Sequence, residues 1–192
     1  MTALVASTGG LGVLIRILSL LPPDIAASLL VSLHQQPDRP SELVGLLAAR
    51  AEVPVRVAAD GDHLGVGQVL VVPPGRHLIV TSAGTVGLLN TGAAPPSRPS
   101  ADLLFATLAV TCGPRALGVV LSGHGHDGQA GVRAIVRCGG TVLAQDRDSS
   151  AQFGMPGAAI DTQLVHEINI LPPDGIAAAI TVHANREPPS RA

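Results

Sequence analysis

The sequence is nearly devoid of aromatic residues. It has no tryptophan and no tyrosine, and Phe105 and Phe153 are its only phenylalanines. Proteins that bind nucleic acid stack bases on aromatic rings and follow the phosphate backbone with clustered cations. The formal net charge is −2, and no cluster of basic residues stands out along the chain. We therefore expect no nucleic-acid partner.

Long hydrophobic runs are also missing, although 46% of the residues are hydrophobic and only 14% are charged. The longest apolar stretches, such as 25–33 and 116–121, fall well short of the roughly 20 residues that span a bilayer. No basic residue precedes the first apolar run, 3–6, so the start lacks the charged region of a secretory signal. We expect a cytoplasmic protein without membrane insertion.

Cysteine is scarce, and Cys112 and Cys138 stand far apart without a Cys-x-x-Cys pair. That spacing is typical neither of a disulfide framework nor of a zinc–thiolate site. We expect both thiols to be reduced and to fill helix-packing surfaces.

Short runs of valine, isoleucine and leucine alternate with longer segments of helical spacing, which predicts an α/β fold. We expect a mostly parallel, doubly wound sheet in a three-layer α/β/α arrangement, because continuous apolar strands are typical of sheets buried on both faces. The expected strands are 3–6, 29–33, 68–72, 116–121 and 141–145, and the expected helices are 11–20, 41–50, 101–112, 129–138 and 175–182. Two helix starts carry capping signals, at 38–42 and at Ser100.

The middle of the chain differs, since 53–89 is rich in glycine and proline. Its short β-like runs, 77–82 and 85–89, predict a small antiparallel hairpin insertion at one edge of the sheet. Residues 90–99 are loop-like, and 185–192 are expected to form a flexible tail. We expect 1–184 to form a single domain.

A serine stands where the first strand meets the first helix, in Val-Ala-Ser-Thr-Gly-Gly (5–10). Ligands and catalytic groups collect at the carboxyl ends of parallel strands. Gly9 and Gly10 permit a sharp bend that keeps the Ser7 hydroxyl exposed at a positive helix end. A simple helix N-cap is the competing interpretation, and Val5 replaces the first glycine of a Gly-x-Ser-x-Gly elbow.

A nucleophilic serine needs a base and a group that orients the base. His34 follows the second strand, and Asp127 lies in a glycine-rich loop just past the strand 116–121. A structural histidine and a helix N-cap aspartate remain open interpretations when each is taken alone. All three residues follow strand ends, which favours a Ser-His-Asp site.

The order Ser, His, Asp differs from that of α/β-hydrolases, chymotrypsin and subtilisin. The sequence resembles instead the catalytic domain of the chemoreceptor protein-glutamate methylesterases of the CheB type. The matching segments are Ala-Ser-Thr-Gly-Gly (6–10), Ser-Leu-His (32–34), Arg-Pro-Ser-Ala-Asp-Leu-Leu-Phe (98–105), Gly-Val-Val-Leu-Ser-Gly-His-Gly-His-Asp-Gly (118–128), Gly-Gly-Thr-Val-Leu-Ala-Gln-Asp (139–146) and Phe-Gly-Met-Pro-Gly-Ala-Ala-Ile (153–160).

The resemblance implies a serine esterase that removes methyl groups from γ-glutamyl esters of bacterial chemoreceptors and releases methanol, with glutamine deamidation as a further activity of some members. It implies Ser7 as nucleophile, His34 as general base and Asp127 as orienting acid, with no metal or organic cofactor. The expected oxyanion and active-site loop residues are Thr8, Gly9, Gly123, His124 and Gly125. The expected partner is the helical cytoplasmic part of a methylated receptor, with Arg98 and Arg39 as possible contacts to its carboxylates.

Two departures from the family pattern bear on function. The loop commonly reads Gly-Met-Gly-x-Asp-Gly, whereas this sequence has His124 and His126 beside Asp127. These imidazoles raise the alternative of a metal-assisted hydrolase with His34 and Asp127 as further ligands. Many relatives also carry a receiver domain before the catalytic part, and we expect none here. A third hypothesis is a non-catalytic module of the same fold that docks to a receptor or signalling partner.

Overall fold

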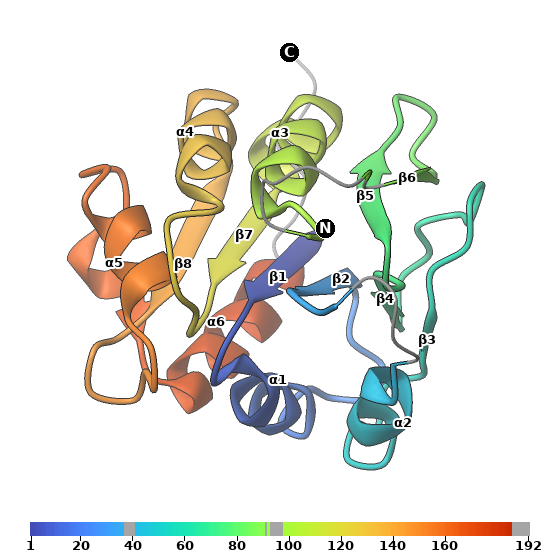
Figure 1. Cartoon of the computed structure of the whole chain (residues 1–192), viewed down its shortest axis with the longest axis horizontal. Coiled ribbons are helices and arrows are strands. Elements are labelled where there is room, and N and C mark those ends of the chain that lie inside the picture. Colours follow the sequence, from blue (N-terminus) through green and yellow to red (C-terminus); the bar gives the residue numbers. More distant parts are fainter. Residues whose placement is uncertain (37–40, 91, 93–97, 186–192) are drawn as a thin grey trace.

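The computed structural model describes residues 1–36, 41–90, 92 and 98–185, which form helices packed on both faces of a parallel sheet (Figure 1). The sheet order is β3-β4-β2-β1-β7-β8-β9, and every pairing in it is parallel. The strands are β1 (Thr2–Ala6), β2 (Ser28–Leu33), β3 (Val55–Val57), β4 (Gln68–Val71), β7 (Leu117–Val120), β8 (Thr141–Gln145) and β9 (Ile170–Leu171).

Helices cover both faces of the sheet, which explains why its strands are continuously apolar. One face packs against α1 (Gly10–Leu18), α2 (Leu43–Ala48) and α6 (Pro173–Ala184), and the other against α3 (Ala101–Cys112), α4 (Gln129–Arg137) and α5 (Gly154–Ile160) (Figure 1). Successive residues of β1 alternate between the two cores, with Val5 in the α3 core and Leu4 in the α1 core. The predicted three-layer α/β/α fold is therefore confirmed.

The strand order reverses beside β1. The chain leaves β1 toward β2 and the β4–β3 edge, and returns through α3 to place β7 on the other side of β1. In open α/β sheets, ligands bind outside the carboxyl ends of the strands at such a switch point. This fold thus directs attention to the loops that follow β1 and β7.

The predicted hairpin is present as β5 (Arg76–Val80) and β6 (Val86–Asn90), which pair antiparallel in a separate two-stranded sheet. Its inner side chains, Leu78 and Val80, belong to the core beneath α3. The rest of 53–89 differs from the expectation, because β3 pairs parallel with β4 and extends the main sheet by one strand.

The five predicted strands and five predicted helices are all confirmed, with ends that move by a few residues. Ser100 is the predicted N-cap, since its hydroxyl accepts a hydrogen bond from the Leu103 N–H. Ser41 accepts similarly from Leu43 N, while 38–40 and the predicted tail beyond Asn185 lie outside the described residues. The sequence did not predict β3, β9 or α5, nor the 3₁₀ turns η1 (Gly113–Arg115) and η2 (Glu167–Asn169).

One side chain joins α3 to its neighbours. Phe105 is fully buried, and a Cβ added at Gly131 of α4 would lie 2.5 Å from the Phe105 Cβ. A Cβ at Gly118 of β7 would approach the same ring within 3.3 Å. The ring therefore fills the space that two glycines leave open between α3, α4 and the sheet.

We predict that Phe105→Ala lowers the free energy of unfolding by about 3–5 kcal/mol, because it removes a large buried ring and leaves a cavity. Urea unfolding followed by circular dichroism measures this loss. The control is Val110→Ala on the same helix, whose side chain is 81% exposed and whose truncation should change stability by less than about 0.5 kcal/mol. Equal losses in the two variants would contradict this account of the core.

Candidate active site

Three strand ends come together at the switch point. His34, directly after β2, donates its backbone N–H to the carbonyl of Ala6 at 2.9 Å. Ser7, directly after β1, donates its N–H to the carbonyl of Ser122 after β7, also at 2.9 Å. The parallel pairing thus continues beyond the strands and sets Ser7 between His34 and the loop after β7.

The His34 ring pairs with Asp127. Nε2 of His34 lies 2.8 Å from Oδ2 of Asp127, and the two side chains are 16% and 6% exposed. A carboxylate only accepts hydrogen bonds, so in the neutral ring Nε2 carries the proton and Nδ1 has a free lone pair. Among the described residues, the Ser7 hydroxyl has no hydrogen-bond partner. The structure therefore brings the three predicted residues together, with the His–Asp contact formed and the serine hydroxyl uncommitted.

Asp127 also accepts hydrogen bonds from the N-terminus of α3. The backbone N–H groups of Ala101 and Asp102 donate to its carboxylate at 2.8 and 3.1 Å, and the Ser100 hydroxyl lies 3.4 Å from Oδ1. Helix N-termini leave such N–H groups unpaired and carry partial positive charge. The carboxylate is thus held between the imidazole and a helix end.

These contacts keep Asp127 ionised. Burial by itself would raise the pKa of Asp127, but the hydrogen bonds from His34 and from the backbone of Ala101 and Asp102 outweigh it. The pKa of Asp127 consequently lies below its ordinary value. The carboxylate is therefore charged at neutral pH and suited to stabilise a positive imidazole.

Asp102 makes the reverse contact, from α3 to the start of α4. Its Oδ1 accepts the Gly131 N–H at 2.8 Å. Burial raises the pKa of Asp102, with the nearby charge of Asp127 adding to the effect. The two aspartates therefore cap each other's helices, and this crossed arrangement fixes the α3 and α4 starts relative to one another.

The Ser7 loop is shaped by Gly9, which has a φ of +82° as the N-cap of α1. A Cβ there would lie 2.6 Å from the Ala151 Cβ and 2.8 Å from the Ser122 hydroxyl, so only glycine fits. The N–H groups of Thr8 and Gly9 have no partner among the described residues. This loop thus presents two backbone donors beside the serine.

Ser122 connects the loops that surround Ser7. Its buried hydroxyl donates to the Thr8 carbonyl at 2.9 Å and accepts the Gln152 N–H at 3.0 Å. Its own N–H donates to Oε1 of Gln145, and the amide nitrogen of Gln145 donates to the Ser149 carbonyl. The sequence analysis did not identify Ser122 or Gln145, although both lie in the segments that resemble the family. The signal that could have identified them is a polar residue at the end of an apolar strand.

In the glycine-rich loop after β7, one of the expected backbone N–H donors is already engaged. The Gly123 N–H is engaged with the Gln152 carbonyl at 2.9 Å, while the residues at 124 and 125 are exposed. His126 is exposed as well, and within the described ranges no group of three or more His, Cys, Asp or Glu side chains is close enough to hold a metal ion. The structure therefore does not gather His124 and His126 with His34 and Asp127.

Arg98 lies near this region but is engaged with its own loop. Its guanidinium donates to the Gly92 carbonyl at 2.8 Å, and its carbonyl accepts the Gln35 N–H at 3.2 Å. The second contact ties the segment before α3 to the residue that follows His34. Arg39 lies outside the described residues.

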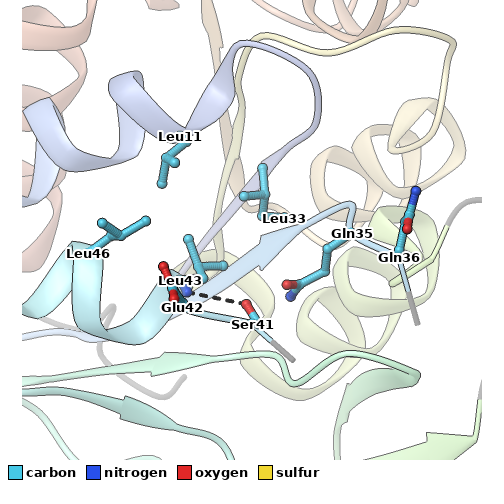
Figure 2. Close-up of a pocket in the computed structure, with 8 residues that line it drawn as sticks. All are labelled: Leu11, Leu33, Gln35, Gln36, Ser41, Glu42, Leu43 and Leu46. Atoms are coloured by element: carbon cyan, nitrogen blue, oxygen red, sulfur yellow. Dashed lines mark hydrogen bonds between the residues drawn. The ribbon is translucent and has the colours of Figure 1, made fainter. Parts of the chain in front are cut away.

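A pocket of about 300 Å³ opens beside the end of β2 (Figure 2). Leucines of α1 and α2 face one another across it, and Leu33 and Gln35, the two chain neighbours of His34, form part of its wall. The lining residues are Leu11, Leu33, Gln35, Gln36, Ser41, Glu42, Leu43 and Leu46. The surface next to His34 is therefore largely apolar with a polar rim.

A serine, a histidine and an aspartate at the strand ends of a parallel α/β sheet are typical of a hydrolase that forms an acyl-serine. The profile of the CheB methylesterase family matches residues 2–180, and the chain belongs to that family. This finding confirms the resemblance that the sequence suggested.

Individual relatives agree with the family assignment. The chain is 41% identical over 170 residues to a Myxococcus xanthus protein named protein-glutamate methylesterase/protein-glutamine glutaminase 4, covering 88% of this chain and 48% of that protein. It is 43% identical over 186 residues to a Cereibacter sphaeroides protein named protein-glutamate methylesterase/protein-glutamine glutaminase 2, covering 95% and 50%. The chain thus spans about half the length of these curated relatives.

A solved structure shares the fold. The crystal structure of the Thermotoga maritima CheB methylesterase catalytic domain superimposes with a TM-score of 0.88 at 28% identity, covering 94% of this chain and 96% of that one. No helix in the described residues combines the length and the apolar character needed to cross a bilayer. The cytoplasmic location stays a prediction.

We predict that Asp127→Asn lowers the free energy of unfolding at pH 7 by about 1–3 kcal/mol, because an amide cannot satisfy both the imidazole and the helix N–H groups. The pKa of Asp127 is lowered in the folded state, so its stabilising contribution is present above the unfolded value of about 4. That contribution is lost as the pH falls through the folded pKa. Urea unfolding at a series of pH values should therefore show the gap between variant and wild type closing below about pH 4.

The control for this series is Asp24→Asn, at an exposed aspartate without a hydrogen-bond partner among the described residues. This substitution should leave the unfolding free energy nearly unchanged at every pH. A constant gap between Asp127→Asn and wild type down to pH 2 would contradict the role assigned to the Asp127 charge.

Proposed function

We propose that this chain hydrolyses the γ-methyl esters of glutamyl residues in a chemoreceptor protein and releases methanol, with Ser7, His34 and Asp127 as its catalytic residues. The observation that carries the proposal is the His34–Asp127 pair set beside an uncommitted serine hydroxyl at the switch point of the sheet. Membership of the CheB methylesterase family supports the ester as substrate.

The acylation step follows from the protonation states that the contacts impose. Nδ1 of His34 takes the Ser7 proton while Oγ attacks the ester carbonyl, which gives a tetrahedral intermediate with a negative oxygen. The imidazolium formed lies against the ionised carboxylate of Asp127, which stabilises it. His34 then gives the proton to the methoxy oxygen as its bond to the former carbonyl carbon breaks, so methanol leaves and an acyl-serine remains.

Water completes the cycle by the same route. His34 takes a proton from water as the water oxygen attacks the carbonyl carbon of the acyl-serine. It then gives that proton to Ser7 Oγ as the bond between Oγ and the acyl carbon breaks. The products are the free enzyme and the γ-carboxylic acid, which ionises to glutamate at neutral pH. Water is the only co-reactant of the complete cycle.

The negative oxygen that develops in each step needs donors. In the described part of the chain, the backbone N–H groups of Thr8 and Gly9 at the start of α1 have no acceptor, and the backbone N–H groups of His124 and Gly125 on the opposite loop are further donors. Each donor of this kind is worth about 2.7–4 kcal/mol of transition-state stabilisation. Gly123 is left out of this set because its N–H is bound to Gln152.

Two further parts of the proposal concern the substrate. The names of the relatives include protein-glutamine glutaminase, and attack on a γ-carboxamide by the same residues would release ammonia in place of methanol. We also propose that the partner is the helical cytoplasmic part of the receptor, with Arg98 near one of its carboxylates. The hydrogen bond from the Gln35 N–H to the Arg98 carbonyl, which places Arg98 close to the residue after His34, supports that placement.

We predict that Ser7→Ala and His34→Ala each lower methanol release from a methylated chemoreceptor preparation by at least about 1000-fold. Headspace gas chromatography measures the methanol, and thermal unfolding verifies that the variants fold. Ser19→Ala, at the end of α1, and His166→Ala, at an exposed histidine, are the matched controls and should retain wild-type rates.

The outcomes separate the competing hypotheses. Full turnover in Ser7→Ala would exclude the acyl-serine mechanism. A wild-type chain that binds the receptor without releasing methanol would support the non-catalytic module. Loss of activity with a chelator, together with stoichiometric metal in the purified protein, would favour the metal-assisted alternative.

A further inference from the structure

A histidine outside the main sheet lies against the helix end that holds Asp127. His77 belongs to β5 of the hairpin, and its Nδ1 accepts the backbone N–H of Ser100 at 2.9 Å. A backbone N–H can only donate, so Nδ1 of His77 is unprotonated and its proton is on Nε2. His77 also lines a surface pocket with Ser100 and Asp102.

The N–H groups at the start of α3 are all accounted for. The Ser100 N–H goes to His77, those of Ala101 and Asp102 go to Asp127, and that of Leu103 goes to the Ser100 hydroxyl. The first turn of the helix is therefore held from two sides, by the hairpin and by the aspartate. Loss of either acceptor leaves a buried or half-buried donor unpaired.

We propose that His77 is a positioning residue for Asp127: by accepting the Ser100 N–H, it fixes the first turn of α3 in the orientation in which Ala101 and Asp102 hold the carboxylate against His34. This inference deepens the proposed function, since it rests on the assignment of Asp127 as the catalytic acid. It gives the β5–β6 hairpin a role in the site, whereas Ser7, His34 and Asp127 all follow strands of the main sheet.

The contact demands a neutral His77. When Nδ1 is protonated, a donor faces the Ser100 N–H, and the hydrogen bond is lost. Among the described residues, the charges that act on the ring are Asp127 from the loop after β7 and Arg98 from the segment before α3, and Asp102 of α3 lines the same pocket. Leu89 is opposite His77 on β6 and carries no charge.

Burial lowers the pKa of His77, and the positive charge of Arg98 adds to this while Asp127 opposes it. The net pKa lies below the ordinary histidine value of about 6.5. The ring is therefore neutral at pH 7 and becomes charged only in more acidic solution. We expect the hold on α3 to weaken there.

Two substitutions at residue 77 separate the hydrogen bond from the titration. His77→Asn retains an acceptor close to the Nδ1 position and does not titrate, whereas His77→Leu removes the acceptor. We expect His77→Leu to lower kcat about tenfold with little change in KM, because a displaced catalytic group costs rate without weakening substrate binding. His77→Asn should restore most of kcat, and His63→Leu, at an exposed histidine of a neighbouring segment, is the control.

The pH dependence of kcat distinguishes a positioning role of His77 from a purely structural one. Any group other than residue 77 that affects kcat is common to wild type and His77→Asn, so its effect cancels in the ratio of the wild-type kcat to the His77→Asn kcat. This ratio should be constant above about pH 6.5 and fall at lower pH as wild-type His77 becomes protonated. A ratio that is independent of pH, with kcat retained in His77→Leu, would overturn the proposal.

Amide hydrogen exchange tests the same contact without turnover. We expect the N–H groups of Ala101 and Asp102 to exchange faster in His77→Leu than in wild type, and to be protected in His77→Asn. If wild type releases no methanol, the proposed function fails, and the positioning contact is judged by exchange alone. Unchanged protection in His77→Leu would overturn it. If His77→Leu does not fold, two measurements still decide the question. One is the pH dependence of the ratio of the wild-type kcat to the His77→Asn kcat. The other is amide exchange of Ala101 and Asp102 in wild type as the pH is lowered, corrected for the intrinsic pH dependence of exchange.

Discussion

The buried carboxylate of Asp127 is the constraint on which the site depends. A charge that is 6% exposed is costly unless every oxygen is paired, and this one is paired with the His34 ring and with two N–H groups of α3. The same pairing holds the imidazole with Nε2 protonated, which leaves the lone pair of Nδ1 available. One set of hydrogen bonds therefore fixes both the position of α3 and the orientation of the His34 ring, because a displacement of α3 would remove the N–H donors from the carboxylate that holds the ring.

The polar contacts divide into two groups that meet at the strand ends. Asp127, Asp102 and His77 connect α3, α4 and the hairpin on the acid side. Ser122 and Gln145 connect the loops after β1, β7 and β8 on the serine side. The two groups are linked through backbone bonds, from His34 to the carbonyl before Ser7 and from Ser7 to Ser122. The parallel sheet thus sets the spacing between Ser7 and His34, while side-chain contacts set the orientation of the His34 ring and of the Ser7 loop.

The sequence predicts the fold and the three central residues because their signals are local. Ser7, His34 and Asp127 each follow an apolar run, and parallel strands bring their carboxyl ends to one edge of the sheet. The short strands β3 and β9 and the helix α5, which begins Gly-Met-Pro-Gly, have weak local propensity and depend on tertiary packing. They were accordingly not predicted.

The roles of His77 and Asp102 cannot be predicted from the sequence for a different reason. A hydrogen bond from Ser100 to His77 joins residues 23 positions apart, and that from Asp102 to Asp127 joins residues 25 apart. No periodicity or capping rule couples such positions, since each looks like an ordinary edge histidine or N-terminal aspartate when read locally. The pairing of Asp102 with α4 and of Asp127 with α3 follows only from the sheet order, in which β7 returns beside β1 and carries the α4 start against the α3 start. The fold therefore converts two commonplace capping residues into a single crossed support, and one of them carries the charge that the site requires.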